Sequence, residues 1–398
     1  MSTDSITTVL IIGGGLGGLA LAQLLLQSSS SIKVLVFERD ETEISRDQGY
    51  CIGIDSTGLD TLDKIRVLDQ LLSDESNGYS SITGFRMCNR YLQTLFEFKA
   101  PDPDRFKLIY REDLRNALLT NIDVQWNKRF TSYKILDDGI EAYFDDGTIV
   151  HGTILIGCDG ARSLVRAQLI PDFQRNDLRI INSAGTIEPY DDMIKIHQIS
   201  KDSGVRIFGK QGHSMLVLPF RQSWIWGLSW PEQGDHEERN VSTAQLVDKI
   251  RQHFNNDELV RLAERTSPSS YLAPYRMYSA LCLKQNPFPN NPRVTLLGDA
   301  AHPMTTQAGK GANTAFADAL DLADALLNPS SSSLSDYEQK MFKRGFDTVK
   351  ASLGMTNMIH LTGWKGLLRD CILSIISYMM PLINVISMPL RLFKKKHD

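Results

Sequence analysis

The sequence predicts an α/β protein: a parallel sheet built from βαβ units, a mainly antiparallel sheet inserted into it, and a C-terminal helical segment. Three observations support this fold class. An apolar strand, a glycine-rich loop and a helix open the chain between Val9 and Gln27, and a second strand, Lys33 to Glu38, follows. Residues 171–290 carry alternating and aromatic runs that are typical of antiparallel strands. Residues 331–398 have helical patterning.

Composition limits the class of protein before any motif is considered. The chain has 398 residues, 42% of them hydrophobic, and its 43 basic and 47 acidic residues give a formal net charge of −4. This balance is ordinary for a globular protein of about two or three domains and gives no indication of nucleic-acid binding. The five cysteines are widely spaced and form no Cys-x-x-Cys pair, so we predict neither a disulfide framework nor a metal site.

The loop after the first strand has the glycines that a dinucleotide phosphate requires. Gly13, Gly15 and Gly18 satisfy the spacing Gly-x-Gly-x-x-Gly, with Gly14 between them. Such a loop permits a tight turn, a close approach of pyrophosphate to the backbone and a helix whose N-terminal amides face the phosphates. Glu38 ends the next strand, where a carboxylate can accept hydrogen bonds from ribose hydroxyls. Together these features predict a Rossmann-like dinucleotide-binding domain.

Two further segments follow predicted buried strands. The strand Thr153 to Cys158 leads into CDGARSLVR, which contains Asp159. The strand Arg293 to Leu297 leads into GDAAHPMTTQAGKGANTAF, which contains Asp299 and begins a predicted helix over residues 311–327. With the glycine loop, these segments resemble the three fingerprints of the single-component FAD-dependent monooxygenases, the aromatic hydroxylase-like flavoproteins. The resemblance covers roughly residues 5–330.

This resemblance implies FAD as the cofactor and gives roles to further residues. It puts Asp299 at the ribityl chain of FAD and assigns Asp159 to the FAD pyrophosphate and to nicotinamide handling. It also aims the helix that starts with Gly311, Ala312 and Asn313 at the pyrimidine edge of the flavin. A helix N-terminus there stabilises negative charge by roughly 1 kcal/mol.

Two arginines and one departure belong to the same comparison. Arg111, in YREDLR, matches an arginine that lies against the flavin or its phosphates. Arg46, in SRDQGY, matches a more variable arginine near the isoalloxazine, and a solvated surface arginine is its alternative. Thr306 stands where family members often have proline, which bears on the loop beside the flavin ring. His302 is expected to be a packing residue.

The sequence contains no recognisable catalytic triad, metal cluster or carboxylate pair, so the catalytic residues are unknown. The resemblance implies that NAD(P)H reduces FAD, that O2 adds at the flavin C4a carbon, and that the resulting hydroperoxide transfers one oxygen atom. The expected reaction is hydroxylation or epoxidation of a small aromatic, polyketide or terpenoid substrate of secondary metabolism. The aromatic strands from Met215 to Trp230 are the expected pocket wall, with plain structural core as the alternative.

Other functions remain open on these motifs. A flavin-dependent halogenase is one alternative, because residues 224–229 read WIWGLS and partly match a halogenase phrase. A Baeyer-Villiger type oxidase uses the same flavin oxygen chemistry. Outside enzymology, a prenyl-GTPase escort-like protein would share the fold without flavin.

The motif order divides the chain into three parts. Residues 1–170 and 291–330 form the expected FAD-binding domain, which is split in sequence by a substrate-binding sheet domain at residues 171–290. Residues 331–398 form a C-terminal helical region with an apolar amphipathic tail.

The tail raises the question of a membrane. Apolar residues repeat at helical spacing from Trp364 to Met379, and Pro381 and Pro389 are expected to interrupt the segment. This pattern predicts a helix packed on the protein or a peripheral membrane contact. Residues 395–398, KKHD, resemble a dilysine retrieval signal, with a solvated basic end as the alternative. The few, widely spaced cysteines favour a reducing compartment, so we expect a cytoplasmic protein, with the cytosolic face of the endoplasmic reticulum membrane as the alternative location.

Overall fold

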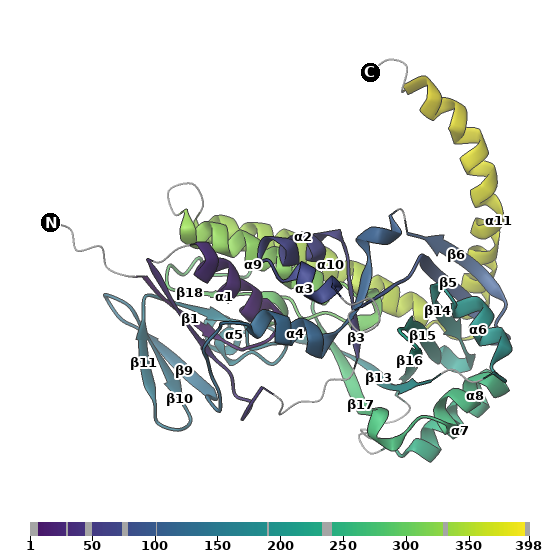
Figure 1. Ribbon diagram of the computed structural model, residues 1–398, viewed down its shortest axis with the longest axis horizontal. Helices are drawn as coiled ribbons and strands as arrows, with labels where there is room; N and C mark the ends of the chain where they lie inside the picture. The colour runs from purple at the N-terminus through teal and green to yellow at the C-terminus, as the bar shows by residue number, and fades with distance from the viewer. Residues whose placement is uncertain are drawn as a thin grey trace. The chain divides into compact units, whose positions relative to one another are not determined.

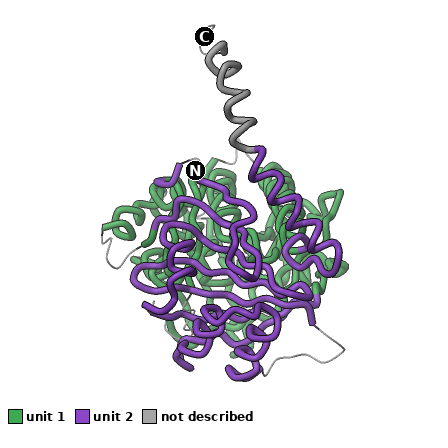
Figure 2. The backbone as a smooth tube through the Cα atoms, turned by 90° about the vertical axis from the view of Figure 1, so that its right-hand side faces the viewer, with its two compact units in different colours: residues 1–80, 105–178, 277–356 green, residues 81–104, 179–276, 357–398 purple. Residues whose placement is uncertain are grey.

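The structure is a computed structural model, and it divides into two compact units (Figure 2). It describes residues 7–28, 31–43, 50–73, 79–100, 102–188, 191–232, 241–328 and 333–394, with side chains as far as Met379. The first unit comprises residues 1–80, 105–178 and 277–356, and the second comprises residues 81–104, 179–276 and 357–398. Each unit has its own buried apolar core.

A parallel sheet of the first unit has the strand order β18-β12-β1-β2-β8. Figure 1 labels two of its strands, β18 and β1. All of its neighbouring strands are parallel. The strands are β1 Thr7–Ile12, β2 Ile32–Phe37, β8 Val124–Gln125, β12 Ile154–Gly157 and β18 Val294–Leu296. Val9, Leu10 and Ile11 are completely buried, as expected for a strand in a sheet covered on both faces.

Helices and two smaller sheets complete the first unit. The helices are α1 Leu16–Ser28, α2 Ser56–Lys64, α3 Leu68–Leu72, α4 Arg111–Leu119, α5 Leu164–Leu169, α9 Gly311–Leu327 and α10 Leu334–Ile359. A sheet of order β3-β7-β4 consists of Cys51–Ile54, Lys107–Tyr110 and Tyr79–Ser81. An antiparallel sheet of order β11-β10-β9 consists of β9 Phe130–Ile135, β10 Ile140–Phe144 and β11 Ile149–Gly152. The sequence Asp-Asp-Gly occurs in both of its connections, at residues 137–139 and 145–147.

The second unit is built on a mainly antiparallel sheet of order β17-β13-β16-β15-β14-β5-β6. Its strands are β5 Gly84–Asn89, β6 Thr94–Lys99, β13 Arg175–Ile187, β14 Ser203–Phe208, β15 Ser214–Phe220, β16 Ser223–Pro231 and β17 Tyr271–Ala280. Its helices are α6 Ile194–Ser200, α7 Thr243–Phe254, α8 Asp257–Glu264 and α11 Gly363–Lys394. The predicted α/β fold class, with its inserted antiparallel sheet, is confirmed.

The two units differ from the predicted division of the chain. Strands β5 and β6 were expected in the first domain, within residues 1–170, but β5 pairs in parallel with β14 of the second sheet. The expected C-terminal region, residues 331–398, is also not one body. Helix α10 buries Tyr337, Met341 and Val349 in the first core, whereas α11 belongs to the second unit.

The C-terminal helix also corrects one expectation. The backbone of α11 is helical from Gly363 to Lys394, so Pro381 and Pro389 do not interrupt it. A proline removes one helical hydrogen bond and bends a long helix without always ending it. Within the residues that the structure describes, no helix has both the length and the hydrophobicity needed to cross a bilayer.

Candidate active site

The predicted motifs lie at one edge of the parallel sheet. Gly13 follows β1, Glu38 follows β2, Asp159 follows β12 by one residue, and Asp299 follows β18 after a short turn. These four strands are consecutive neighbours in the order β18-β12-β1-β2 and point the same way. Their carboxyl ends therefore meet at one edge, which is where open α/β sheets bind ligands.

The glycine loop has a shape that only glycine allows. Gly13 has φ +115°, and a Cβ on it would lie 2.3 Å from the carbonyl oxygen of Cys158. A Cβ on Gly18 would lie 2.2 Å from the carbonyl oxygen of Gly13. By contrast, a Cβ on Gly15 would meet no atom within 4 Å. The loop is thus closely packed on its inner side and open above Gly15, where a phosphate can approach.

Glu38 is held against this loop. Its Oε2 accepts a hydrogen bond from the Gly14 amide at 2.8 Å, and its Oε1 accepts one from the Asp40 amide at 3.1 Å. The sequence analysis missed a neighbour of this pair, Arg115. Its Nε donates to the Gly14 carbonyl oxygen at 3.4 Å, and burial, followed by the charge of Arg111, lowers its pKa. The four-residue spacing of the two arginines on α4 was the available signal.

Asp159 caps helix α5 and keeps one oxygen without a protein partner. Its Oδ2 accepts from the amides of Leu164 at 2.7 Å and Val165 at 3.3 Å. Its Oδ1 is buried and has no hydrogen-bond partner among the described residues. Burial raises the pKa of this carboxyl group. A buried acceptor without a partner is costly, so this oxygen fits a site that a ligand or water completes.

A buried arginine that sequence reasoning also missed connects the second and third motifs. The Arg166 side chain donates from Nη2 to the Ala161 carbonyl oxygen at 2.7 Å and from Nη1 to the Ala300 carbonyl oxygen at 2.7 Å. Burial lowers its pKa to about 10. Arg166 therefore fixes the loop that contains Asp159 relative to the turn that contains Asp299.

Asp299 and the first turn of α9 lie next to each other. A Cβ on Gly311 would be 3.9 Å from Asp299 Oδ1. Desolvation by the surrounding chain raises the pKa of the Asp299 carboxyl group, while the charges of His302, Arg166 and Arg111 oppose that shift. A helical hydrogen bond at the start of α9 runs from the Thr314 amide to the Lys310 carbonyl oxygen at 2.9 Å. The amides of residues 311–313 come before it and point out of the N-terminal end of the helix.

The side chain of Asn313 is occupied by the fold. Its Nδ2 donates to the Gly53 carbonyl oxygen at 2.8 Å, and its Oδ1 accepts from the Asp55 amide at 3.0 Å. Only the backbone amide of Asn313, with those of Gly311 and Ala312, is available to a cofactor. Asn313 also borders a separate cavity of about 380 Å³ beside α9 and α10.

Of the two predicted arginines, Arg111 belongs to the described part of the chain. Arg46 lies outside the described residues. Arg111 begins α4, and its amide donates to the Tyr50 carbonyl oxygen at 3.0 Å. Its charge lowers the pKa of Asp299, so the guanidinium lies within electrostatic range of that carboxyl group.

His302 is a buried packing residue, as expected. Its Nε2 lies 2.6 Å from Asp318 Oδ2, and both side chains are completely buried. Burial alone lowers the pKa of His302, but Asp318 raises it above the ordinary value. Arg344 Nη2 contacts the other oxygen, Asp318 Oδ1, at 2.8 Å. Asp318 Oδ2 also accepts from the Gly298 amide at 3.2 Å, so this network supports the turn that carries Asp299.

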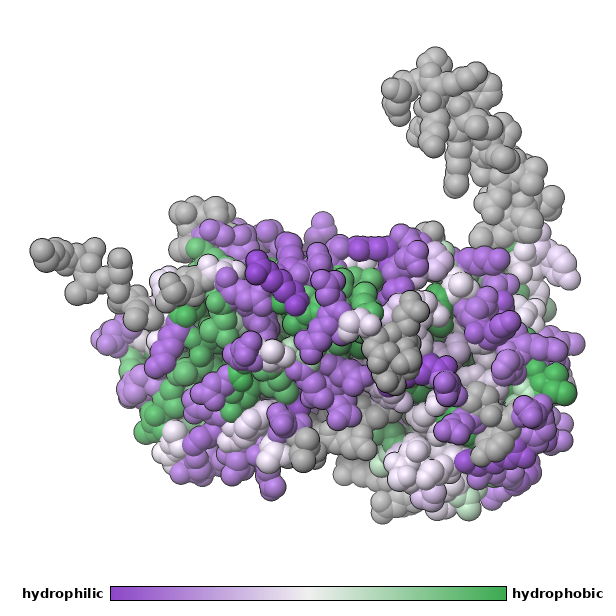
Figure 3. Space-filling model, viewed as in Figure 1, coloured by the Kyte–Doolittle hydropathy of each residue, from purple (hydrophilic) through white to green (hydrophobic). Residues whose placement is uncertain are grey.

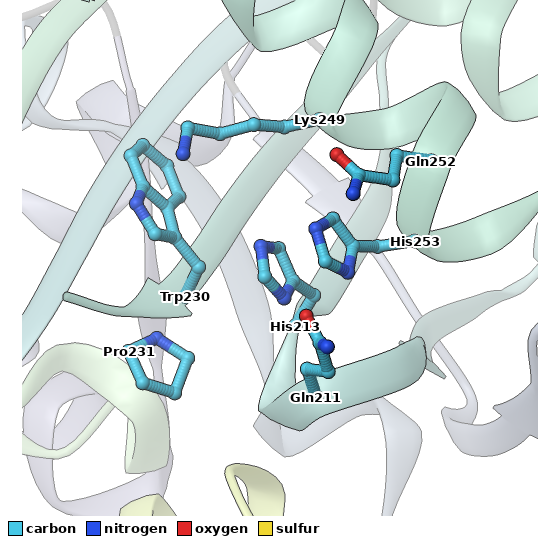
Figure 4. Close-up of a pocket in the computed structure, with 7 residues that line it drawn as sticks. All are labelled: Gln211, His213, Trp230, Pro231, Lys249, Gln252 and His253. Atoms are coloured by element: carbon cyan, nitrogen blue, oxygen red, sulfur yellow. The ribbon is translucent and has the colours of Figure 1, made fainter. Parts of the chain in front are cut away.

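The second unit has a cavity of its own, of about 110 Å³ (Figure 4). His213 and His253 stack in it with ring centroids 3.4 Å apart, and Lys249 Nζ lies 5.2 Å from the centre of the Trp230 ring. Burial, followed by the charge of His253, lowers the pKa of His213 to about 3. The cavity is lined by none of the predicted site residues.

The expected pocket wall in this unit is mostly core. Trp224, Trp226 and Trp230 are buried in the second apolar cluster, which also includes residues of α7 and α8. Trp226 Nε1 donates to Thr266 Oγ1 at 2.9 Å. These side chains are therefore structural core, which was the alternative prediction for these strands. The opposite face of the same strands carries Leu216 and Leu218, which are less buried.

Comparison with known proteins identifies the family. Residues 6–350 match the family model described as FAD binding domain. The chain belongs to this FAD binding domain family. The predicted recognition of single-component FAD-dependent monooxygenases and the predicted cofactor, FAD, are thereby confirmed. The chain is an FAD-dependent oxidoreductase.

Relatives and solved structures agree with this family. The FAD-dependent monooxygenase thnD of Trichoderma harzianum is 29% identical over 391 residues, covering 86% of this chain and 91% of its own. The monooxygenase cfoF of Aspergillus candidus is 26% identical, and the match covers 89% of this chain and 91% of cfoF. The fold is similar to that of Klebsiella pneumoniae HpxO with FAD and uric acid, with a TM-score of 0.77, 20% identity, and coverage of 93% and 97%. A putative FAD-containing monooxygenase from Photorhabdus luminescens gives a TM-score of 0.76 at 26% identity, covering 88% and 98%.

The residues at the sheet edge fit FAD. The open space above Gly15 suits a phosphate, and the partnerless Oδ1 of Asp159 suits a donor from the ligand or from water. The amides at the start of α9 suit a negatively charged ring edge.

Proposed function

We propose that this protein is an NAD(P)H-dependent flavoprotein monooxygenase that inserts one oxygen atom from O2 into a small substrate. Hydroxylation or epoxidation of an aromatic, polyketide or terpenoid compound is the proposed reaction. The observation that carries the proposal is the arrangement of three flavin motifs and Glu38 on four neighbouring strand ends. The fungal relatives, which are named as FAD-dependent monooxygenases, support the reaction class.

Each predicted residue has a proposed task. The amides around Gly13, Gly14, Gly15 and Gly18 bind the pyrophosphate, and α1 directs its N-terminus at it. Glu38 accepts hydrogen bonds from the ribose hydroxyls in addition to those from the Gly14 and Asp40 amides. A carboxylate can accept about four hydrogen bonds, so its present partners need not leave.

Charged residues complete the proposed cofactor site. Asp299 accepts hydrogen bonds from the ribityl chain, Asp159 contributes beside the pyrophosphate, and Arg111 supplies positive charge near Asp299. We include Arg46 in the proposal on its sequence position alone. Arg115 extends the same positive charge to the glycine loop.

Bound FAD would supply the redox chemistry by which NAD(P)H provides two electrons for the reduction of O2, one oxygen atom entering the substrate and the other leaving as water. The chain supplies position and electrostatics. The amides of residues 311–313 stabilise negative charge on the reduced ring, by roughly 1 kcal/mol. No acid or base of the chain is assigned to the oxygen transfer.

We also propose a cytoplasmic location. All five cysteines are free thiols, and burial raises the pKa of Cys51 to about 12, which keeps that thiol unreactive. Free thiols throughout a chain fit a reducing compartment.

The test begins with native purification and a visible spectrum. We expect a yellow protein that releases FAD on denaturation and that oxidises NADPH or NADH faster when a substrate is present. With ¹⁸O2, the product should gain one labelled oxygen atom. A colourless protein that cannot be loaded with FAD, or a flavoprotein that never incorporates oxygen across phenols, polyketides and terpenoids, would contradict the proposal. Halide-dependent product would instead favour the halogenase alternative.

A further inference from the structure

Helix α11 shows its polar side to its own unit. The part of α11 described with side chains packs along β6. On this side Gly366 is buried, and Arg369 is only 8% exposed. The Arg369 guanidinium lies 3.6 Å from the centre of the Phe208 ring and donates to the Ile359 carbonyl oxygen at 2.9 Å. Its Nη2 also pairs with Asp370 Oδ1 at 2.7 Å. The helix is therefore anchored by an arginine rather than by an apolar stripe.

The other side of α11 exposes large apolar side chains. Trp364 and Leu367 are each 69% exposed, and Tyr378 is 82% exposed. The remaining exposed members are Leu368, Ile372, Ile375, Ile376 and Met379. At 100° per residue these positions cover about half of the helix circumference. We call these eight residues the outward face of α11.

This arrangement is the reverse of an ordinary surface helix, which buries its apolar stripe and exposes its polar side. Much of the molecular face drawn in Figure 3 is hydrophilic, with hydrophobic residues gathered mainly at its left, over the first unit. A contiguous apolar helix face on a protein surface indicates an interaction site.

The charges around the outward face select a lipid surface. Lys365 lies beside Trp364, with its Nζ 5.9 Å from the ring centre. Further along the sequence, residues 370–390 contain one charge, Asp370, and Arg391, Lys394, Lys395 and Lys396 follow. Lys365 beside this face, and the excess of basic residues later in the sequence, are complementary to anionic headgroups and disfavour a second copy of the same helix.

The aromatic residues and the length of the apolar segment agree with a helix that lies on a bilayer. Trp364 and Tyr378 are 14 residues apart, which is about 21 Å along the axis. Tryptophan and tyrosine favour the boundary between headgroups and acyl chains. A helix that is apolar along one side only fits the plane of the interface.

We propose that α11 binds an anionic phospholipid bilayer, with its outward face inserted between the lipids and Lys365 against the headgroups. The helix then holds the flavoprotein at a membrane where apolar compounds concentrate. This proposal concerns binding alone and stands whether or not the oxygen-transfer function is correct.

The experiment uses the full-length holoenzyme and extruded vesicles. We expect co-flotation with vesicles of phosphatidylcholine and 30% phosphatidylserine, weaker binding to phosphatidylcholine alone, and weakening at high salt. The double variant Leu367→Glu/Ile375→Glu should lower the partition coefficient at least tenfold. The matched control is Ile194→Glu/Ile149→Glu, which replaces exposed isoleucines elsewhere, and it should bind within twofold of the native protein. Retained flavin absorbance shows that each variant is folded.

A second measurement does not depend on adding charge to the helix. Trp364 fluorescence should shift to the blue on adding vesicles and be quenched by brominated acyl chains, and Trp364→Phe should lose this signal. Absence of vesicle binding, or equal binding by native protein and Leu367→Glu/Ile375→Glu, would overturn the proposal. So would a dimer in sedimentation velocity that this double variant abolishes while native protein ignores vesicles, since the face would then bind a second copy.

Discussion

Replacing Asp318 with asparagine tests the buried network behind the third flavin motif. Both carboxylate oxygens are occupied: Oδ2 accepts from His302 Nε2 at 2.6 Å and from the Gly298 amide at 3.2 Å, and Oδ1 accepts from Arg344 Nη2 at 2.8 Å. Asparagine has nearly the same size but no charge, and its amide nitrogen would face a donor on either side.

The structure sets the size of the effect. Asp318 is completely buried, and although burial raises its pKa, the charges of His302 and Arg344 hold it below the ordinary value. Removing one partner of a buried ion pair costs about 3–5 kcal/mol. That is a large part of the roughly 5–15 kcal/mol by which most domains are stable. We expect Asp318→Asn to lower the free energy of unfolding by about 3 kcal/mol or more.

The assay is urea unfolding of the holoprotein, followed by circular dichroism and by release of FAD. The control is Asp321→Asn, one turn along α9, because Asp321 pairs with the same arginine at 2.7 Å but is 27% exposed. A partly exposed pair contributes about 1 kcal/mol or less, so the control should stay close to native. If Asp318→Asn costs no more than the control, the buried network is not what stabilises this motif.

Three further predictions concern cofactor binding and pH. Gly13→Ala should abolish FAD retention and lower the unfolding temperature, because its Cβ would lie 2.3 Å from a backbone oxygen; a yellow, stable variant would refute the close-packed loop. Glu38→Gln should raise the FAD dissociation constant about tenfold in equilibrium dialysis, whereas the exposed neighbour Glu41→Gln should match the native protein. The pKa of His213 is lowered from 6.5 to about 3, so the unfolded state binds the proton first and stability falls as pH drops below about 6.5. Between about pH 7.5 and pH 5 the free energy of unfolding of the native protein should fall by about 2 kcal/mol more than that of His213→Gln. Parallel plots of unfolding free energy against pH for the two proteins would contradict this.

The parts of the site that sequence could predict are the parts that depend on local spacing. Gly13, Glu38, Asp159 and Asp299 each follow a short apolar strand closely, and the carboxyl ends of parallel strands meet at one edge. A continuous apolar run and a glycine spacing are each recognised within about 10 residues of sequence. The fold class and the position of the motifs follow from that information.

The parts of the fold and the site that could not be predicted depend on contacts between residues far apart in sequence. The Asn313 side chain bonds to Gly53 and Asp55, which are 260 and 258 residues away in sequence. Strand β5 pairs with β14 more than 100 residues later, so no periodicity in its own segment reveals which sheet it joins. Arg166 was quoted within a motif, but its direction toward Ala300 is a property of the folded backbone.

The division of the chain has a consequence for synthesis and engineering. The chain passes between the two units after residues 80, 104, 178, 276 and 356, and residues 357–398 are the last segment of the second unit. No single cut separates the units, so an exchange of one unit between relatives would have to replace three segments at once. On the ribosome, neither unit has all of its strands or helices until most of the chain has emerged. Folding is therefore expected largely after synthesis, when chaperones have most time to act on exposed apolar strands.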